Sequence, residues 1–278
     1  MPEPEPAPAY ESLRQVTPWA AVVLAENPSA MTLEGTNTWV LRDEAGRRSA
    51  LVVDPGPENE RHLTTVVEAA GRVETILLTH GHPDHADGAR RLHELTGAPV
   101  LALDPAHRYG SEGVGEGMTV AGAGVELRVW RTPGHTSDSL SFLLAPDGLA
   151  DGRLDDGRPD GTAAVLTGDT ILGRGTTVVA HPDGVLADYL DSLHRLAALS
   201  GVTVLPGHGP ELADAGAAAE AYLAHREQRL EQVRRTLADA GGELSPAQVV
   251  ERVYVDVDRA LWPAAELSVR AQLEYLRR

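Results

Sequence analysis

The chain has 278 residues, of which 42% are apolar and 23% charged, values typical of a globular protein with one large domain or a large domain and a small appendage. It contains no cysteine, which excludes disulfides, thiol nucleophiles and thiolate metal ligands. The net charge of −17 disfavours a surface that attracts nucleic acid as a whole, and no apolar run is long enough to cross a bilayer, so we expect no membrane partner.

The first twelve residues alternate proline with glutamate and lack the basic start and apolar stretch of a signal peptide. We therefore expect residues 1–12 to be disordered and the protein to be cytoplasmic. The acidic excess is uneven along the chain. The segment from Gly216 onward carries nine arginines against ten acidic residues, so nearly all of the negative charge lies before it.

Beyond the first residues, short apolar runs alternate with helical patterns, which indicates an α/β architecture. The turn signal Asp54-Pro55-Gly56 closes one such run, and Gly97 ends a helix that starts at Asp84. A Gly-, Asp- and Pro-rich stretch over residues 146–161 predicts a flexible excursion between two strands. The strands are predicted at residues 21–24, 38–41, 50–53, 75–79, 100–103, 125–129, 140–144, 164–167 and 203–205, and the helices at 60–70 and 84–96.

After Pro210 the pattern becomes helical. One long helix is predicted over residues 217–240, a second from Ser245-Pro246 to Tyr254, and a last one from Trp262-Pro263. Their apolar faces are too small to form an independent core, so we expect them to pack on the larger part of the chain. The sequence thus predicts a large α/β domain over residues 1–215 and a small helical or winged-helix-like domain over residues 216–278.

A metal-binding motif follows one of the predicted strands. The apolar run ends in THGHPDH, which places His80, His82, Asp84 and His85 within six positions. Side chains two residues apart in an extended chain leave on the same side, and the turn into the next helix directs Asp84 and His85 elsewhere. Asp84 alone would be an ordinary helix cap, but three histidines and an aspartate at one strand end favour a metal centre.

Three further segments share one design, in which an apolar run and a small-residue turn precede a side chain that can bind a metal. Each is weak evidence by itself, because a lone histidine or aspartate in a turn is common. Together with THGHPDH and in this order they are strong evidence for a metal centre. The segments are TPGH ending in His135, LTGD ending in Asp169 and LPGH ending in His208. The other histidines lack such companions and are expected to be surface or packing residues: His62, His93, His107, His181, His194 and His225.

In this order the motifs resemble the metal-binding motifs of the metallo-β-lactamase superfamily. The resemblance covers residues 22–210 and implies a four-layer αββα sandwich with two metal ions at one edge. It also implies two zinc ions, although iron or manganese can occupy such His and Asp ligands. The implied ligands are His80, His82 and His135 for one metal, Asp84, His85 and His208 for the other, and Asp169 as a bridge.

The same residues separate the chain from some members of the superfamily. β-Lactamases of the commonest subclass use a cysteine ligand, which is absent here. Di-iron electron-transfer relatives carry an acidic residue in place of His82. A mono-iron persulfide dioxygenase needs only three of the ligands, so the presence of the other residues disfavours it without excluding it.

Three further stretches are similar to the β-lactamase-like protein 2 group, whose best-known members are single-strand endoribonucleases with a winged-helix-like appendage. These stretches are EGTNTW at residues 34–39, GDTILGRGT at 168–176 and PGHGP at 206–210. Asn37, Arg174 and Thr176 flank the predicted ligands and are candidates for contacting the substrate.

The resemblance implies a hydrolase in which two cations activate a bridging water as hydroxide, with Asp84 orienting it and accepting its proton. Two substrate classes stay open: a phosphodiester in single-stranded RNA, favoured by the whole-chain resemblance, and a small thioester or lactone as in the glyoxalase II relatives, favoured by the acidic composition. A non-catalytic binding module is a third alternative, although it would not need the full ligand set.

Overall fold

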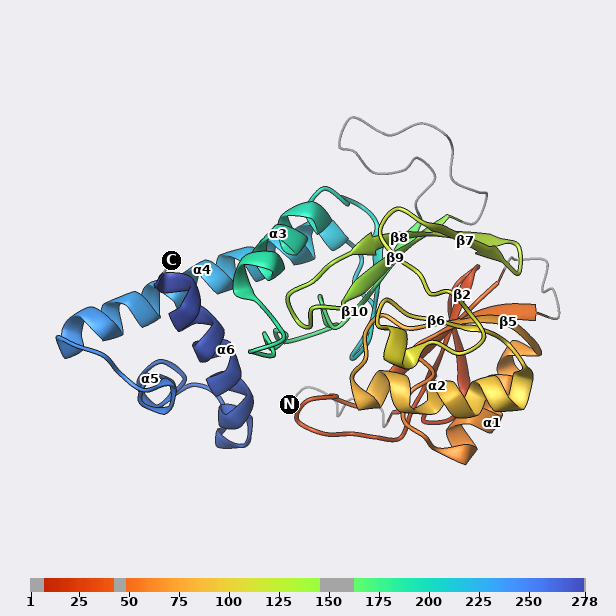
Figure 1. Ribbon diagram of the computed structural model, residues 1–278, viewed down its shortest axis with the longest axis horizontal. Helices are drawn as coiled ribbons and strands as arrows, with labels where there is room; N and C mark the ends of the chain where they lie inside the picture. Colours follow the sequence, from red (N-terminus) through yellow and green to blue (C-terminus); the bar gives the residue numbers. More distant parts are fainter. Residues whose placement is uncertain (1–7, 43–48, 146–162, 278) are drawn as a thin grey trace, which may run out of the picture. The chain divides into compact units, whose positions relative to one another are not determined.

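The computed structural model describes residues 8–42, 49–145 and 163–277 and divides into two units (Figure 1). The N-terminal unit comprises Met1–Gly113 with Ala121–Val125, and the C-terminal unit comprises Val114–Val120 with Glu126–Arg278. The predicted excursion over residues 146–161 lies outside the described residues. The predicted domain boundary after residue 215 does not coincide with the limits of these units and stays a prediction. No helix in the described ranges is both long and apolar enough to span a membrane.

The N-terminal unit is a mixed sheet with two helices. Its strands follow the order of the chain: β1 (Leu13–Thr17), β2 (Ala20–Leu24), β3 (Asn37–Leu41), β4 (Ser49–Val53), β5 (Arg72–Leu77) and β6 (Val100–Leu101). Pairing is antiparallel from β1 to β4 and parallel from β4 to β6. Parallel neighbours need crossover connections, which α1 (Glu60–Ala70) and α2 (Pro83–Thr96) provide side by side on one face of the sheet (Figure 1).

Local sequence signals account for both helices. The Asn59 side chain caps α1 by accepting from two backbone amides, and Pro83 occupies the first turn of α2, where a missing N–H costs nothing. Gly97 ends α2 in the left-handed conformation that the sequence predicts. Leu63 of α1 and Leu92 of α2 are fully buried in one apolar cluster with the sheet, so these helices cover that face.

The second mixed sheet has the order β11 (Thr203–Pro206), β10 (Ala164–Gly168), β9 (Leu140–Ala145), β8 (Val125–Arg131) and β7 (Thr119–Gly122). It belongs to the C-terminal unit except for Ala121–Val125, which are counted with the N-terminal unit. Strand β9 is antiparallel to both β8 and β10, and β11 is parallel to β10. Strands β8, β10 and β11 therefore run in one direction, and their carboxyl ends lie at one edge of the sheet. Helix α3 (Leu186–Leu196) buries Tyr189 and Leu193 in a cluster with Val165 and Val204 of that sheet.

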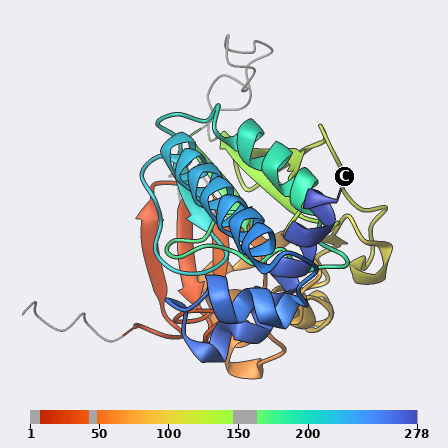
Figure 2. The same ribbon diagram turned by 90° about the vertical axis from the view of Figure 1, so that its left-hand side faces the viewer.

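Three helices complete this unit: α4 (Ala215–Ala240), α5 (Pro246–Val253) and α6 (Trp262–Leu276). Ser245 and Gln248 form a reciprocal capping box at the start of α5. Figure 2 shows α4 alongside α3, and Ala219 and Tyr222 of α4 belong to the same apolar cluster as Tyr189. Helices α4 and α6 thus share an apolar cluster with the sheet of this unit, whereas α5 packs against α4 and α6 in a second cluster.

Some elements escape the sequence pattern. Strand β1 is largely exposed, β7 is short, and α3 follows Val185, which provides no side-chain cap. The expected disordered lead-in also differs. Its residues 1–7 lie outside the described part, but Tyr10 bridges to Leu24 and the Glu11 carboxylate lies 2.8 Å from Nδ1 of buried His62. A hydrogen bond between Glu11 and His62 and a strand contact hold this end of the segment in place.

Candidate metal centre

The N-terminal unit places the THGHPDH motif at the carboxyl end of β5, where the chain turns into α2. The Thr79 hydroxyl donates to Asp54 at 2.7 Å, so its oxygen accepts from Nδ1 of His80 at 3.0 Å. Nε2 of His80 then carries the lone pair and lies 3.1 Å from Nδ1 of His82. Two nitrogens bound to one tetrahedral zinc ion lie about 3.4 Å apart. This histidine pair therefore has a spacing that suits a shared metal ion.

His85 and Asp84 form the second part of this cluster. Nδ1 of the fully buried His85 donates to Asp54 at 2.9 Å, which fixes the tautomer and leaves Nε2 as the atom that can bind a metal. That Nε2 lies 3.4 Å from a carboxylate oxygen of Asp84, whose side chain is 28% exposed. The carboxylate oxygen is a hard donor and the imidazole nitrogen a borderline one. At this spacing the two atoms suit zinc, iron or manganese.

Asp54, which the sequence pattern marks only as part of a turn, supports this cluster through hydrogen bonds. It is buried at the carboxyl end of β4, and its carboxylate accepts from the Thr79 amide, the Thr79 hydroxyl and His85. Its φ of +53° is uncommon for a residue with a Cβ atom and marks a backbone held in place by these contacts. The sequence feature that indicates Asp54 is its position directly after β4, the strand parallel to the strand β5 that precedes THGHPDH.

The C-terminal unit brings the other three predicted ligands together. Asp169 and His208 follow the neighbouring parallel strands β10 and β11, and His135 follows β8 at the same edge. One oxygen of Asp169 lies 3.4 Å from Nε2 of His208, and the other lies 3.7 Å from Nε2 of His135. A carboxylate that offers one oxygen to each of two histidines has the arrangement of a bridge between two ions.

His135 depends on the glycine before it. Gly134 has φ of +134°, and a Cβ atom there would lie 2.3 Å from the Cα of Tyr189 in α3. Only glycine fits this close approach, so the turn can lie against α3 and present the histidine. The Nδ1–H of His135 donates to the Val178 carbonyl at 2.7 Å, which leaves Nε2 directed at Asp169.

The candidate substrate residues have different environments. Arg174 and Thr176 are exposed in the C-terminal unit, in the segment that follows Asp169. Asn37 is buried at the start of β3 in the N-terminal unit.

The donors of both clusters are side chains that can hold a divalent metal ion. The fixed tautomers of His80, His85 and His135 support this fit, because in each ring a protein acceptor takes the Nδ1 hydrogen. The set of imidazoles and carboxylates does not identify the metal.

Comparisons with known proteins agree with this chemistry. A family model described as the metallo-beta-lactamase superfamily matches residues 31–208, and a model described as a beta-lactamase associated winged helix domain matches residues 245–278. A Drosophila melanogaster protein named beta-lactamase-like protein 2 homolog is 31% identical, with 91% of this chain and 86% of the relative covered. An Aspergillus fumigatus protein named atrochrysone carboxyl ACP thioesterase is 30% identical, with 86% and 74% covered.

Among solved structures, that of a beta-lactamase domain protein from Burkholderia ambifaria superposes with a TM-score of 0.77 at 22% identity, covering 99% of this chain and 92% of the other. This likeness and the two family models confirm the predicted fold class, an α/β sandwich with a C-terminal winged-helix appendage.

Proposed function

Since this chain belongs to the metallo-β-lactamase superfamily and is a metal-dependent hydrolase, we propose that its two clusters together hold two zinc ions. We further propose that the enzyme cleaves phosphodiesters in single-stranded RNA. The observation that carries the metal part is the Asp169 carboxylate, with one oxygen towards each of two histidines. The family model supports the joint site, since residues 31–208 include both clusters. The proposed ligands are His80, His82 and His135 for one ion, Asp84, His85 and His208 for the other, and Asp169 between them.

When bound, a pair of divalent ions lowers the pKa of a bound water and supplies positive charge that stabilises the transition state. The residues of the chain provide the rest. Asp54 and Val178 hold the rings of His85 and His135 in the ligating tautomer. Asp84, partly exposed at the start of α2, can accept the proton of the attacking water.

Two observations support RNA as the substrate. The likeness to the beta-lactamase-like protein 2 homolog extends over 91% of the chain, and a winged-helix model matches its C-terminal part. This part of the sequence is near neutral in an otherwise acidic chain. The exposed Arg174, five residues after the bridging Asp169, is the proposed phosphate contact.

A thioester is the second candidate substrate. The relative named as an ACP thioesterase is 30% identical over 260 residues, and the net charge of −17 suits a small substrate better than a polyanion. A thioester would present a carbonyl carbon in place of phosphorus, and sulfur as the leaving atom, to the same proposed ligand residues.

The substrate test compares cleavage of a fluorescent single-stranded RNA with cleavage of a panel of acyl thioesters by the purified protein. We expect RNA cleavage, and its loss in Arg174→Ala without loss of metal. The slope of RNA affinity against salt should fall by about one phosphate contact in that variant. Arg234→Ala, an exposed arginine of α4, is the matched control and should cleave RNA normally. Rapid thioester turnover without RNA cleavage would establish the second candidate instead.

A further inference from the structure

The segment that follows β10 is held by the C-terminal helices at successive points. The Leu172 amide donates to the Tyr222 hydroxyl of α4 at 3.0 Å, and the Arg226 guanidinium of α4 donates to the Thr177 carbonyl. The Val179 amide donates to the Ser268 hydroxyl of α6 at 3.1 Å. Since all these groups belong to the C-terminal unit, the helices and the segment form one hydrogen-bonded assembly.

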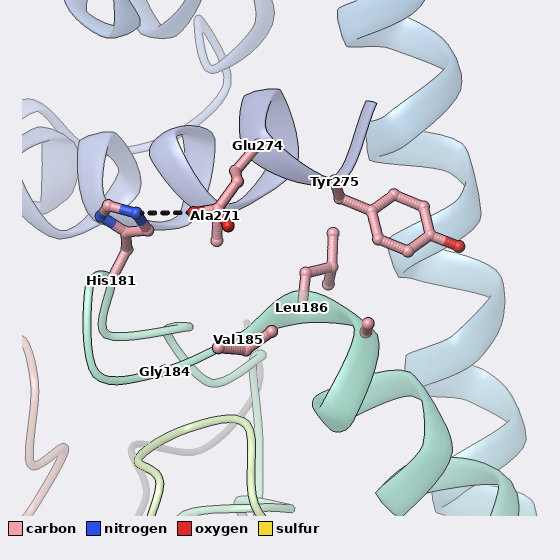
Figure 3. Close-up of a pocket in the computed structure, with 8 residues that line it drawn as sticks. His181, Gly184, Val185, Leu186, Ala271, Glu274 and Tyr275 are labelled. Carbon is pink, nitrogen blue, oxygen red and sulfur yellow. Dashed lines mark hydrogen bonds and ion pairs between the residues drawn. The ribbon is translucent and has the colours of Figure 1, made fainter. Parts of the chain in front are cut away.

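The segment has a further contact with α6 at its far end. Figure 3 shows His181 directed at Glu274, with Nε2 3.1 Å from the carboxylate oxygen, beside a small pocket that includes Tyr275. This pair is partly exposed and so adds little to stability. Its value is positional, because it fixes the path of the segment after Val179.

The same segment orients a metal ligand. The Val178 carbonyl accepts from Nδ1 of His135 at 2.7 Å, and the Thr177 hydroxyl lies 3.3 Å from the same nitrogen. His135 itself is buried, and it lies in a turn beyond the end of strand β8. Its ring orientation is therefore set by residues 177–178, which in turn depend on α4 and α6.

Arg226 is the most unusual member of this assembly. It is 3% exposed, and its Nε finds no hydrogen-bond partner among the described residues. Leaving a charged group buried with an unmade hydrogen bond is costly, so this arginine is expensive as a mere packing residue. A less polar side chain of similar length would fill the space at lower cost.

The contacts of Arg226 connect it indirectly to two proposed ligands of this unit, Asp169 and His135. Its guanidinium carbon lies 5.1 Å from the ring centre of Tyr189. The Tyr189 hydroxyl donates at 2.8 Å to the carbonyl of Thr170, the residue after Asp169. Burial raises the pKa of Tyr189 and so keeps that hydroxyl protonated as a donor. Arg226 thus supports Asp169 through Tyr189 and His135 through Thr177.

We propose that Arg226 is a positioning residue for the metal cluster of the C-terminal unit: it fixes residues 177–178, and through them the tautomer and direction of the His135 ring. The inference rests on the proposed metal-dependent function but concerns a residue that contacts neither metal nor substrate. It assigns the C-terminal helices a direct part in building the metal site.

The test compares Arg226→Gln with Arg226→Lys, which keeps the charge and a donor, and with Arg234→Gln as a control on an exposed face of α4. Nitrogen-15 NMR of the histidine rings in metal-free, full-length protein reports the tautomer of His135, assigned with His135→Asn. Competition with a chelator reports zinc affinity. We expect the wild type and both Arg234→Gln and Arg226→Lys to keep hydrogen on Nδ1. Arg226→Gln should give mixed tautomers and bind one zinc about 10- to 100-fold more weakly.

A wild-type tautomer and wild-type zinc affinity in Arg226→Gln would overturn the inference, even with a lower melting temperature, because the residue would then be only structural. Should that variant not fold, Ser268→Ala removes the partner of the Val179 amide and should produce the same change in His135. The proposed function fails separately: wild-type protein would then bind no zinc, while the NMR comparison would still show whether Arg226 orients His135.

Discussion

At the scale of single residues, the ligand histidines depend on partners that bind no metal. Asp54 fixes Thr79 and His85 together, and Val178 fixes His135. Such outer partners hold each ring in one tautomer and in one direction before a metal arrives. Each cluster is therefore preorganised within its own unit.

Asp54→Asn tests this dependence. The amide keeps the size of the side chain, but it can no longer accept from both Thr79 and His85 with two carboxylate oxygens. We expect metal affinity and turnover to fall about 10- to 100-fold, with a folded protein by circular dichroism. Metal content after dialysis and steady-state kinetics check the expectation. Unchanged values for both would mean that Asp54 serves the backbone alone.

Asp169→Ala tests the bridge. Because its two oxygens face His135 and His208, loss of the carboxylate should lower the affinity for both metals and reduce turnover by more than about 100-fold. Elemental analysis and activity assays measure the two effects. Full activity in this variant would show that the bridge is assigned to the wrong residue.

At the scale of elements, helix α4 carries a histidine with an unusual environment. Burial, followed by the charges of Arg226 and Arg229, lowers the pKa of His225 to about 4, while Asp256 acts in the opposite direction. The unfolded chain binds a proton near the ordinary value of 6.5, but the folded chain binds it only near 4. Between these values the unfolded state holds more protons, so stability falls as the pH falls.

His225→Gln should remove this part of the acid sensitivity. Between pH 6.5 and about 4 we expect the free energy of unfolding to fall less steeply with decreasing pH in the variant than in the wild type. Urea unfolding at a series of pH values gives the slope. Parallel slopes for the two proteins would show that His225 is protonated normally in the fold. His107→Gln is a control, because that histidine lies in a short turn of the N-terminal unit.

The sequence predicts some of the elements and ligands but not others. Helices with caps, such as α1 after Asn59 and α5 after Ser245, were predicted to within a residue or two. Helix α3 was missed because Val185 gives no cap, and Glu11 was placed in a disordered segment because its partner His62 is distant in sequence. The ligand motifs were visible because each follows an apolar strand, whereas Asp54 and Arg226 act through long-range hydrogen bonds that no local pattern reveals.

At the scale of the whole molecule, the C-terminal helices pack both against the second sheet and against one another. Helix α4 shares an apolar cluster with the sheet and α3, and a second cluster joins α4, α5 and α6 around Val233 and Val269. Residues distant in sequence thus stabilise the segment that orients His135.

Removal of residues 216–278 tests the role of these helices. The shortened chain would expose the apolar cluster that contains Tyr189 and Leu193 and lose the contacts to Thr177 and Val179. We expect poor solubility, binding of a hydrophobic dye, and loss of activity. A soluble truncated protein with wild-type turnover on RNA and on thioesters would show that the helices are a tethered accessory.

We propose that the two clusters together hold two divalent ions. Elemental analysis of the purified full-length protein by plasma mass spectrometry tests it most directly, with Asp169→Ala measured alongside. We expect about two metal ions per chain, mainly zinc, and a large loss in the variant. A single iron per chain and no zinc would contradict the dinuclear centre and favour mono-iron dioxygenase chemistry in its place.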